Sequence, residues 1–107
     1  MQLLVLGLSH KTAPLSLRER LAFGPELRDG ALARLLAEPW CREGCILSTC
    51  NRTEIYCLLE RGAGERLRAW WAAERSFTME EAASALYLYQ DDEAVRHAMS
   101  VACGLDS

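Results

Sequence analysis

The chain has 107 residues, a formal net charge of −3, 50% apolar residues and 25% charged residues. This composition fits one ordinary globular domain, and it excludes disorder as the main state because the apolar surface can offset chain entropy. The slightly acidic balance excludes a general polyanion binder, which usually carries a basic stripe. No apolar run approaches the roughly 20 residues that span a bilayer, and no signal peptide is visible, so we expect a cytoplasmic protein with no membrane contact.

The cysteines match neither a disulfide framework nor a zinc site. An odd number of cysteines without a signal peptide argues against disulfides. The two histidines, His10 and His97, are far apart, so the paired ligands of a structural zinc site are missing. We therefore expect no metal, and we expect most of the thiols to be small buried hydrophobes. The five are Cys41, Cys45, Cys50, Cys57 and Cys103.

The first half of the chain predicts a buried strand followed by two helices. The continuous apolar run at residues 3–8 is typical of a strand buried on both faces. Ser16 and Glu19 form a capping-box pattern, which predicts a helix that starts at Ser16 and ends before the Gly-Pro pair. A second helix is predicted over residues 26–37. Its inward face is expected to hold Leu27, Ala31, Leu35 and Leu36.

The middle of the chain predicts two strands and a helix. Strands are expected at residues 44–47 and 53–59, separated by a polar turn. The second of them has no polar face, which is typical of a central strand. A helix follows over residues 65–75, and it should point Leu67, Trp70 and Trp71 inward.

The last part predicts a short edge strand and a terminal helix. Thr78 and Glu81 form a second capping box. A strand is expected at residues 86–89, and a helix over residues 93–103 should be capped by the Asp91-Asp92 pair and ended by Gly104. The elements give an α+β fold, a ferredoxin-like β-α-β-β-α-β sandwich with extra helices. In that arrangement the first and third strands are central, and these are the two without a polar face.

The densest cluster of reactive side chains is Ser-Thr-Cys-Asn-Arg-Thr-Glu at residues 48–54. The thiolate of Cys50 is a candidate nucleophile, and Arg52 can either lower its pKa or bind a substrate carboxylate with two hydrogen bonds. Thr49 and Asn51 add hydrogen-bond donors. From the residues alone, the alternative is a polar turn in which one cysteine fills space.

Other polar and aromatic residues have two interpretations each. His97, near the apolar stripe of the last helix, is a candidate general acid or base, and a surface or half-buried helix histidine is the alternative. Trp70 and Trp71 can stack bases, but their helical spacing favours the core. Arginines such as Arg18 alternate with glutamates, which predicts a solvated mixed-charge face. The chain has no glycine-rich phosphate loop, so no nucleotide site is expected.

Five sequence blocks together carry a resemblance to a known family. Their order and the specific block at residues 47–54 resemble the N-terminal catalytic domain of glutamyl-tRNA reductase. The blocks are Gly-Leu-Ser-His-Lys-Thr-Ala-Pro (7–14), Leu-Arg-Glu-Arg (17–20), Leu-Ser-Thr-Cys-Asn-Arg-Thr-Glu (47–54), Glu-Ala-Val-Arg-His (93–97) and Gly-Leu-Asp-Ser (104–107).

The resemblance implies an activity and a larger protein. The family enzyme reduces the glutamyl group of glutamyl-tRNA(Glu) to glutamate-1-semialdehyde with NADPH, the first step of tetrapyrrole and heme synthesis. It has a Rossmann NADPH domain and a helical dimerisation domain, which this chain does not resemble. We therefore expect residues 1–107 to be a fragment, with NADPH bound outside it, a homodimeric full-length protein, and the aminomutase of the next step as a possible partner.

The resemblance also implies residue roles. Cys50 matches the nucleophile that attacks the aminoacyl ester and forms a thioester, and Thr49, Asn51 and Arg52 match the substrate-binding loop around it. Ser107 matches a substrate-binding serine, and His97 matches a histidine needed for activity. Two alternatives stay open: a ferredoxin-like module that binds RNA or a ligand without catalysis, and a thiol hydrolase. The pI near 5.4 and the scarcity of sheet aromatics argue against base stacking.

Overall fold

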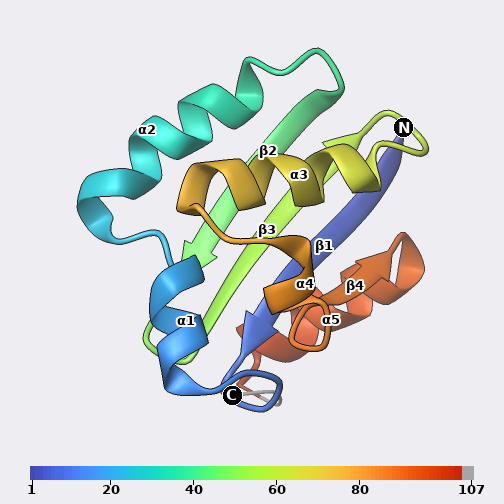
Figure 1. The fold of residues 1–107 in the computed structure, drawn as a ribbon. Helices are drawn as coiled ribbons and strands as arrows, with labels where there is room; N and C mark the ends of the chain where they lie inside the picture. Colours follow the sequence, from blue (N-terminus) through green and yellow to red (C-terminus); the bar gives the residue numbers. More distant parts are fainter. Residues whose placement is uncertain (105–107) are drawn as a thin grey trace.

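The computed structural model describes residues 1–104, which fold into four strands and five helices (Figure 1). None of these helices combines the length and the apolar character that crossing a membrane requires. The mixture of helices with one sheet confirms the predicted α+β class. In chain order the elements are β1 (Gln2–Ser9), α1 (Leu15–Leu21), α2 (Pro25–Leu36), β2 (Cys41–Ser48), β3 (Arg52–Leu59), α3 (Gly64–Arg75), α4 (Met79–Ala82), β4 (Tyr87–Gln90) and α5 (Asp92–Ala102).

The four strands form one sheet in the order β2-β3-β1-β4, and every pair is antiparallel. β1 pairs with β3 along its whole length, from Gln2 opposite Leu59 to Ser9 opposite Arg52. The prediction that the two strands without a polar face are central is confirmed. The strand order and the chain order together are those of the ferredoxin-like sandwich.

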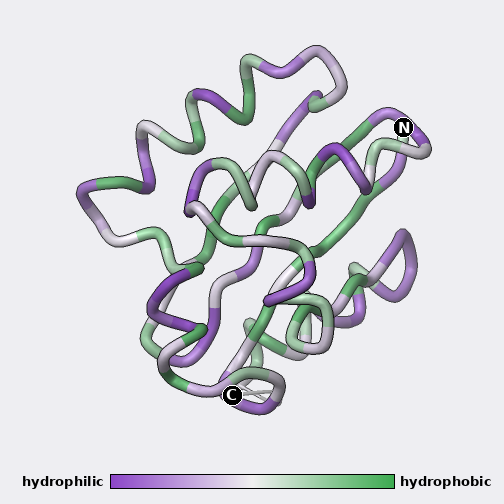
Figure 2. The backbone as a smooth tube through the Cα atoms, in the orientation of Figure 1, coloured by the Kyte–Doolittle hydropathy of each residue, from purple (hydrophilic) through white to green (hydrophobic). Residues whose placement is uncertain are grey.

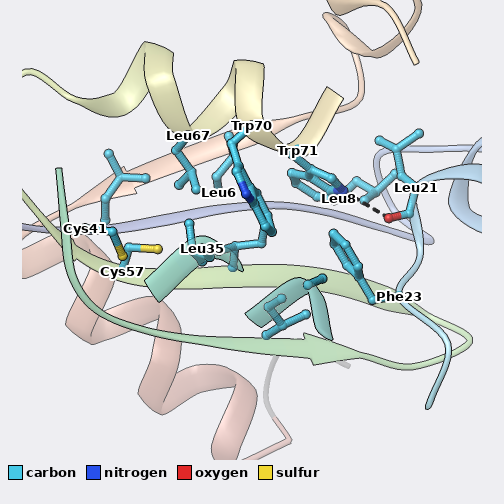
Figure 3. Packing of buried hydrophobic residues seen from close by; sticks show 14 of the residues in the cluster. Leu6, Leu8, Leu21, Phe23, Leu35, Cys41, Cys57, Leu67, Trp70 and Trp71 are labelled. Atoms are coloured by element: carbon cyan, nitrogen blue, oxygen red, sulfur yellow. Dashed lines mark hydrogen bonds between the residues drawn. The ribbon is translucent and has the colours of Figure 1, made fainter. Parts of the chain in front are cut away.

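The two faces of the sheet are covered by different helices. α2 and α3 lie over one face, and Leu4, Leu6 and Leu8 of β1 enter the hydrophobic core between them and the sheet. Successive side chains of a strand point to opposite faces, so Gly7 of β1 and Glu54 of β3 lie on the second face. α5 packs against β4 and β1 on that second face (Figures 1 and 3).

Trp71 is the largest of the fully buried side chains and joins two helices (Figure 3). Its ring meets Phe77 edge-on, with centroids 6.0 Å apart and planes at 85°. The indole Nε1–H donates a hydrogen bond of 3.0 Å to the carbonyl oxygen of Leu21, the last residue of α1. Leu67 and Trp70 enter the same core, as predicted. The position of α1 is therefore fixed by α3.

The predicted inward face of α2 is only partly buried. Ala31 and Leu35 reach the core, whereas Leu27 and Leu36 are exposed, so the prediction is wrong for these two leucines. Hydrophilic and hydrophobic stretches alternate along α2 in Figure 2. The helix packs against β2, at the edge of the sheet, and one edge strand covers only a narrow stripe of it.

Of the two predicted capping boxes, one is confirmed. Thr78 Oγ1 accepts the backbone N–H of Glu81, and the Glu81 carboxylate accepts the backbone N–H of Thr78 in return. The box at Ser16 is wrong, because α1 already begins at Leu15 with Pro14 in the N-cap position. The proline ring fixes φ, which is −69° here, and so starts the helix one residue earlier without a side-chain cap.

The ends of α5 also differ in part from prediction. Asp91 precedes the helix but makes no side-chain cap. Its carboxylate instead accepts the backbone N–H of Leu3, and its own N–H donates to the Leu3 carbonyl, with φ of +50° at Asp91. The long-range bond therefore replaces the local cap. Gly104, with φ of +75°, follows the helix end as predicted.

The thiols divide by exposure, and the prediction that most of them are buried is wrong. Cys41 and Cys57 are buried, whereas Cys45, Cys50 and Cys103 are exposed. Burial, reinforced by Cys41 beside it, raises the pKa of the Cys57 thiol. Since the thiolate is the reactive form, Cys57 is an inert core residue and the exposed thiols are the reactive candidates.

Candidate active site

The loop between β2 and β3 is a tight turn that Thr49 organises. Thr49 Oγ1 accepts the backbone N–H groups of Asn51 and Arg52, each at 3.2 Å. The backbone N–H of Thr49 donates to the Arg52 carbonyl at 2.7 Å, and His10 N–H donates to the Asn51 carbonyl at 2.8 Å. The predicted polar turn is confirmed. It leaves Cys50 exposed at its tip, beside the end of β1.

Arg18 of α1 supports the same turn from the side. Its Nη1 donates to the Cys50 carbonyl at 2.8 Å, and its Nε donates to the Ala13 carbonyl at 3.2 Å. Arg18, predicted to belong to a solvated mixed-charge face, is half-buried, and its guanidinium bridges two backbone segments. A cavity of about 150 Å³ lies next to this contact. It is lined by Leu15, Arg18, Glu19, Ala22, Thr49 and Cys50.

Glu54 is the centre of a second polar cluster, on the sheet face that α5 covers. Its side chain is fully buried. Tyr56 Oη donates to Oε1 at 2.6 Å, and Tyr87 Oη donates to Oε2 at 2.5 Å. Arg52 Nη1 contacts Oε2 at 3.2 Å, and His97 Nε2 is hydrogen-bonded to the same oxygen. We call these five residues the Glu54 cluster.

The electrostatics of the Glu54 cluster favour an ionised carboxylate. Burial alone raises the pKa of Glu54, but the hydrogen bonds from Tyr56, Tyr87 and His97 and the charge of His97 outweigh it, so the pKa lies below its usual range. Burial, followed by the hydrogen bond to Glu54, raises the pKa of both Tyr56 and Tyr87. Both phenols therefore stay protonated at neutral pH.

Aromatic rings hold the imidazole of His97 in place. Tyr89 stacks on it, with centroids 4.6 Å apart and an interplanar angle of 26°, and the ring of Tyr87 lies 5.4 Å away. His97 is buried on α5, so the alternative interpretation as a surface or half-buried histidine is wrong. It also lines a cavity of about 240 Å³. The other lining residues are Tyr89, Glu93, Arg96 and Ser100.

Gly7 leaves the space that the Glu54 side chain occupies. Gly7 pairs with Glu54 across β1 and β3 and with Tyr87 across β1 and β4. A Cβ atom at position 7 would lie 2.7 Å from Glu54 Cγ and 3.0 Å from the Thr53 carbonyl oxygen. Any larger residue therefore has to displace either the carboxylate or the strand.

Gly7→Ala is expected to lower the free energy of unfolding by about 1–3 kcal/mol, the usual cost of overpacking a rigid interior. Urea denaturation measures this loss. Gly30→Ala is the matched control, because Gly30 lies within exposed α2 and its added Cβ meets only the end of the flexible Arg34 side chain. A Gly7→Ala variant as stable as the wild type would refute the close approach of Glu54 to the backbone at position 7.

Comparison with known proteins places this arrangement in a family. The family model described as "Glutamyl-tRNAGlu reductase, N-terminal domain" matches residues 6–107. The chain belongs to the glutamyl-tRNA reductase N-terminal domain family. A solved structure titled "Glutamyl-tRNA Reductase from Methanopyrus kandleri" superimposes with a TM-score of 0.70 at 25% identity. The match covers 98% of this chain and 23% of that chain, so this chain spans about a quarter of that reductase.

The residues that the sequence singled out in this glutamyl-tRNA reductase domain fall into two groups. Thr49, Cys50 and Asn51 form the exposed turn, whereas Arg52 and His97 belong to the Glu54 cluster. Arg52 connects the groups, because it follows the turn and starts β3. Ser107 lies outside the described residues.

Sequence reasoning missed the role of Glu54 and of its tyrosine partners. A signal was present: Glu54 is the one charged residue of the central strand predicted over residues 53–59. A carboxylate at such a position has to be paired when it is buried. Nothing local indicated that Tyr87 and His97, from β4 and α5, would supply the pairing.

The reductase domain does not fit a nicotinamide dinucleotide. Within residues 1–104 the β-turn-α connection richest in glycine is the one before α3, and it follows a strand of an antiparallel sheet. Dinucleotide folds place the pyrophosphate at a helix N-terminus after a parallel strand. Over the same residues, no group of three potential ligands can hold a metal ion.

Proposed function

We propose that this domain carries out the acyl-transfer half of glutamyl-tRNA reduction, with Cys50 as the nucleophile. The Cys50 thiolate attacks the carbonyl carbon of the ester in glutamyl-tRNA(Glu). The carbon–oxygen bond to the terminal ribose breaks, the ribose oxygen takes a proton, and a thioester to Cys50 remains. A thioester accepts hydride more readily than an ester, which gives this covalent step its purpose.

The observation that carries the proposal is the exposed thiol in a turn braced on two sides. Thr49 fixes the turn from within, and Arg18 holds the Cys50 carbonyl from α1. A nucleophile needs this fixed placement because a small misalignment costs much of the rate. We assign Thr49, Asn51 and Arg52 to binding of the glutamyl group, and Ser107 to the same role.

The longer reductase is proposed to use NADPH bound outside these residues, to form a homodimer, and to act in the cytoplasm. Its aldehyde product would pass to the aminomutase of the next step. The tyrosines of the sheet argue against the alternative of an RNA-stacking module. The hydroxyl groups of Tyr56 and Tyr87 donate hydrogen bonds to Glu54, and the ring of Tyr89 stacks on His97.

Intact-mass analysis after brief incubation with glutamyl-tRNA(Glu) tests the nucleophile. The wild type is expected to gain one glutamyl group that a free thiol removes, and Cys50→Ser is expected to gain none. Cys45→Ser is the matched control, because Cys45 is also an exposed thiol and lies within β2, the strand that leads into the turn. An adduct that persists in Cys50→Ser, or that disappears in Cys45→Ser, would assign the chemistry elsewhere.

Released glutamate, measured in the same samples, separates the remaining alternatives. Slow release of glutamate together with an adduct indicates a domain that transfers the acyl group to Cys50 and slowly hydrolyses the thioester. Rapid release without dependence on a hydride donor would favour a thiol hydrolase. Neither adduct nor release, with a folded domain, would favour the binding module. Semialdehyde formed by this chain with NADPH would contradict the assignment of reduction to another domain.

A further inference from the structure

Three of the four groups around the Glu54 carboxylate can only donate hydrogen bonds to it. The Arg52 guanidinium has no acceptor, and a protonated phenol facing a carboxylate donates its hydrogen. Tyr56 and Tyr87 reach the two carboxylate oxygens at 2.6 and 2.5 Å, and Arg52 reaches Oε2 at 3.2 Å. Glu54 is thus surrounded as an ionised, purely accepting group.

The fourth group, His97, meets this acceptor through Nε2. A neutral imidazole carries its hydrogen on one nitrogen and a lone pair on the other, and a lone pair facing a carboxylate is repelled. We propose that Glu54 is a positioning residue that keeps the proton of neutral His97 on Nε2, so that Nδ1 is the nitrogen able to accept a proton.

Hydrogen bonding to Glu54 disfavours the alternative orientation of the ring. A half-turn of the imidazole would replace Nε2 by carbon at Glu54 and leave the buried carboxylate short of a donor. The rings of Tyr89 and Tyr87, with centroids 4.6 and 5.4 Å from that of His97 and 5.5 Å from each other, pack together against the imidazole. The missing side chain at Gly7 gives Glu54 the room to reach it.

This assignment deepens the proposed function and rests on it for its consequence. A histidine whose basic nitrogen is fixed by a buried carboxylate can take a proton during acyl transfer, as in other histidine–carboxylate pairs. Glu54 acts through His97 and touches no reacting atom. The position of the proton itself is a property of the folded domain and does not depend on the substrate.

Nitrogen NMR of the histidine-labelled domain tests the proton position directly. At a pH at which both imidazoles are neutral, the spectrum of His97 should show a protonated Nε2 and an unprotonated Nδ1. The exposed His10 is the internal reference for an imidazole that is free to exchange between tautomers. A wild-type His97 with the proton on Nδ1, or with a mixture of tautomers like that of His10, would overturn the proposal.

Two variants identify the group that fixes the proton. Tyr56→Phe removes a donor to Glu54 but not the contact with His97, so the Nε2–H form should persist. Glu54→Gln replaces the obligate acceptor by an amide that can also donate, so the tautomer preference should fall. A folded Glu54→Gln domain that keeps the Nε2–H form completely would refute the role of Glu54. If Glu54→Gln does not fold, the wild-type spectrum decides.

The rate of glutamyl adduct formation measures the consequence for the reaction. Glu54→Gln is expected to slow acyl transfer to Cys50 by about 100-fold, at the low end of general-base contributions. Leu67→Ala, a core substitution away from the cluster, controls for lost stability and should keep the rate. A wild type with the expected tautomer but no adduct would refute the proposed function and leave the proton assignment intact. A Glu54→Gln variant that forms the glutamyl adduct as fast as the wild type would refute the link between the His97 tautomer and the rate of acyl transfer.

Discussion

Replacing Glu54 with leucine is expected to lower the free energy of unfolding by about 3–5 kcal/mol. The variant deletes the carboxylate that the Arg52 guanidinium, which is only 5% exposed, contacts at 3.2 Å, and removing one partner of a buried ion pair has this typical cost. The hydroxyl groups of Tyr56 and Tyr87 lose their acceptor as well. Urea denaturation at neutral pH measures the loss.

The double variant Arg52→Met with Glu54→Leu provides the control. It removes both charges of the pair and fills their volume with apolar atoms, so it should be less destabilised than the sum of the two single variants. Strict additivity would show that the two side chains do not depend on each other. A Glu54→Leu domain as stable as the wild type would show that the cluster contributes nothing to folding.

The stability difference between the wild type and Glu54→Leu is expected to depend on pH with a definite sign. The pKa of Glu54 is lowered in the folded domain, so the unfolded chain binds the proton more tightly. Its contribution is fully present above the ordinary carboxyl pKa of about 4.3 and is lost as pH falls through the lower folded value. The stability difference between wild type and Glu54→Leu should therefore be constant near neutrality and shrink below about pH 4. A difference that grows on acidification would contradict the direction of the shift.

Trp71→Ala is expected to cost about 3–5 kcal/mol, the usual range for removing a buried aromatic side chain. The indole is fully buried between Phe23 and Phe77, and its loss also leaves the Leu21 carbonyl without its donor. Trp71→Phe keeps most of the apolar contact and loses the hydrogen bond, so it should cost less. Equal losses in the two variants would show that the hydrogen bond, not the packing, dominates.

The Trp71→Phe substitution should also loosen the turn that carries Cys50. Trp71 fixes the end of α1, and α1 carries the Arg18 that holds the Cys50 carbonyl. In Trp71→Phe, amide hydrogen exchange should become faster in α1 and in the turn at residues 49–51. Exchange in α5, on the opposite face of the sheet, should stay unchanged. Equal acceleration in both regions would indicate global rather than local loosening.

The centre of the fold could be predicted from the sequence because burial on both faces leaves a clear pattern. A strand with long apolar runs is typical of a position between two others, and this pattern predicts central places for β1 and for β3, although β3 also carries Arg52, Glu54 and Tyr56 on one face. The edge strand β2 was harder: its residues 41–43 include Arg42 and Glu43, so the predicted strand began only at residue 44. Charged side chains at an exposed sheet edge are compatible with strand pairing, so only the position of the partner strand shows that these residues belong to β2.

The candidate site could be predicted as far as its chemistry is local. The turn around Cys50 is encoded by its own residues, since Thr49 makes the bonds that form it. The Glu54 cluster combines side chains from β3, β4 and α5, and Glu54 and His97 are 43 positions apart. Local patterns therefore placed His97 on a helix near an apolar stripe but not against a buried carboxylate. Asp91 shows the same limit, because its partner Leu3 is 88 positions away.

The pairing of β1 determines when the sheet can form during synthesis. β1 is made first, yet its two partners are the later strands β3 and β4, and the register with β4 joins Leu4 to Gln90. Contacts of such long sequence separation require the closure of large loops and slow the folding reaction. On the ribosome, the apolar β1 segment has to wait until residues 52–59 have emerged before it gains its first neighbour. Until then the nascent chain carries an exposed, strand-forming segment of the kind that favours aggregation and that chaperones protect.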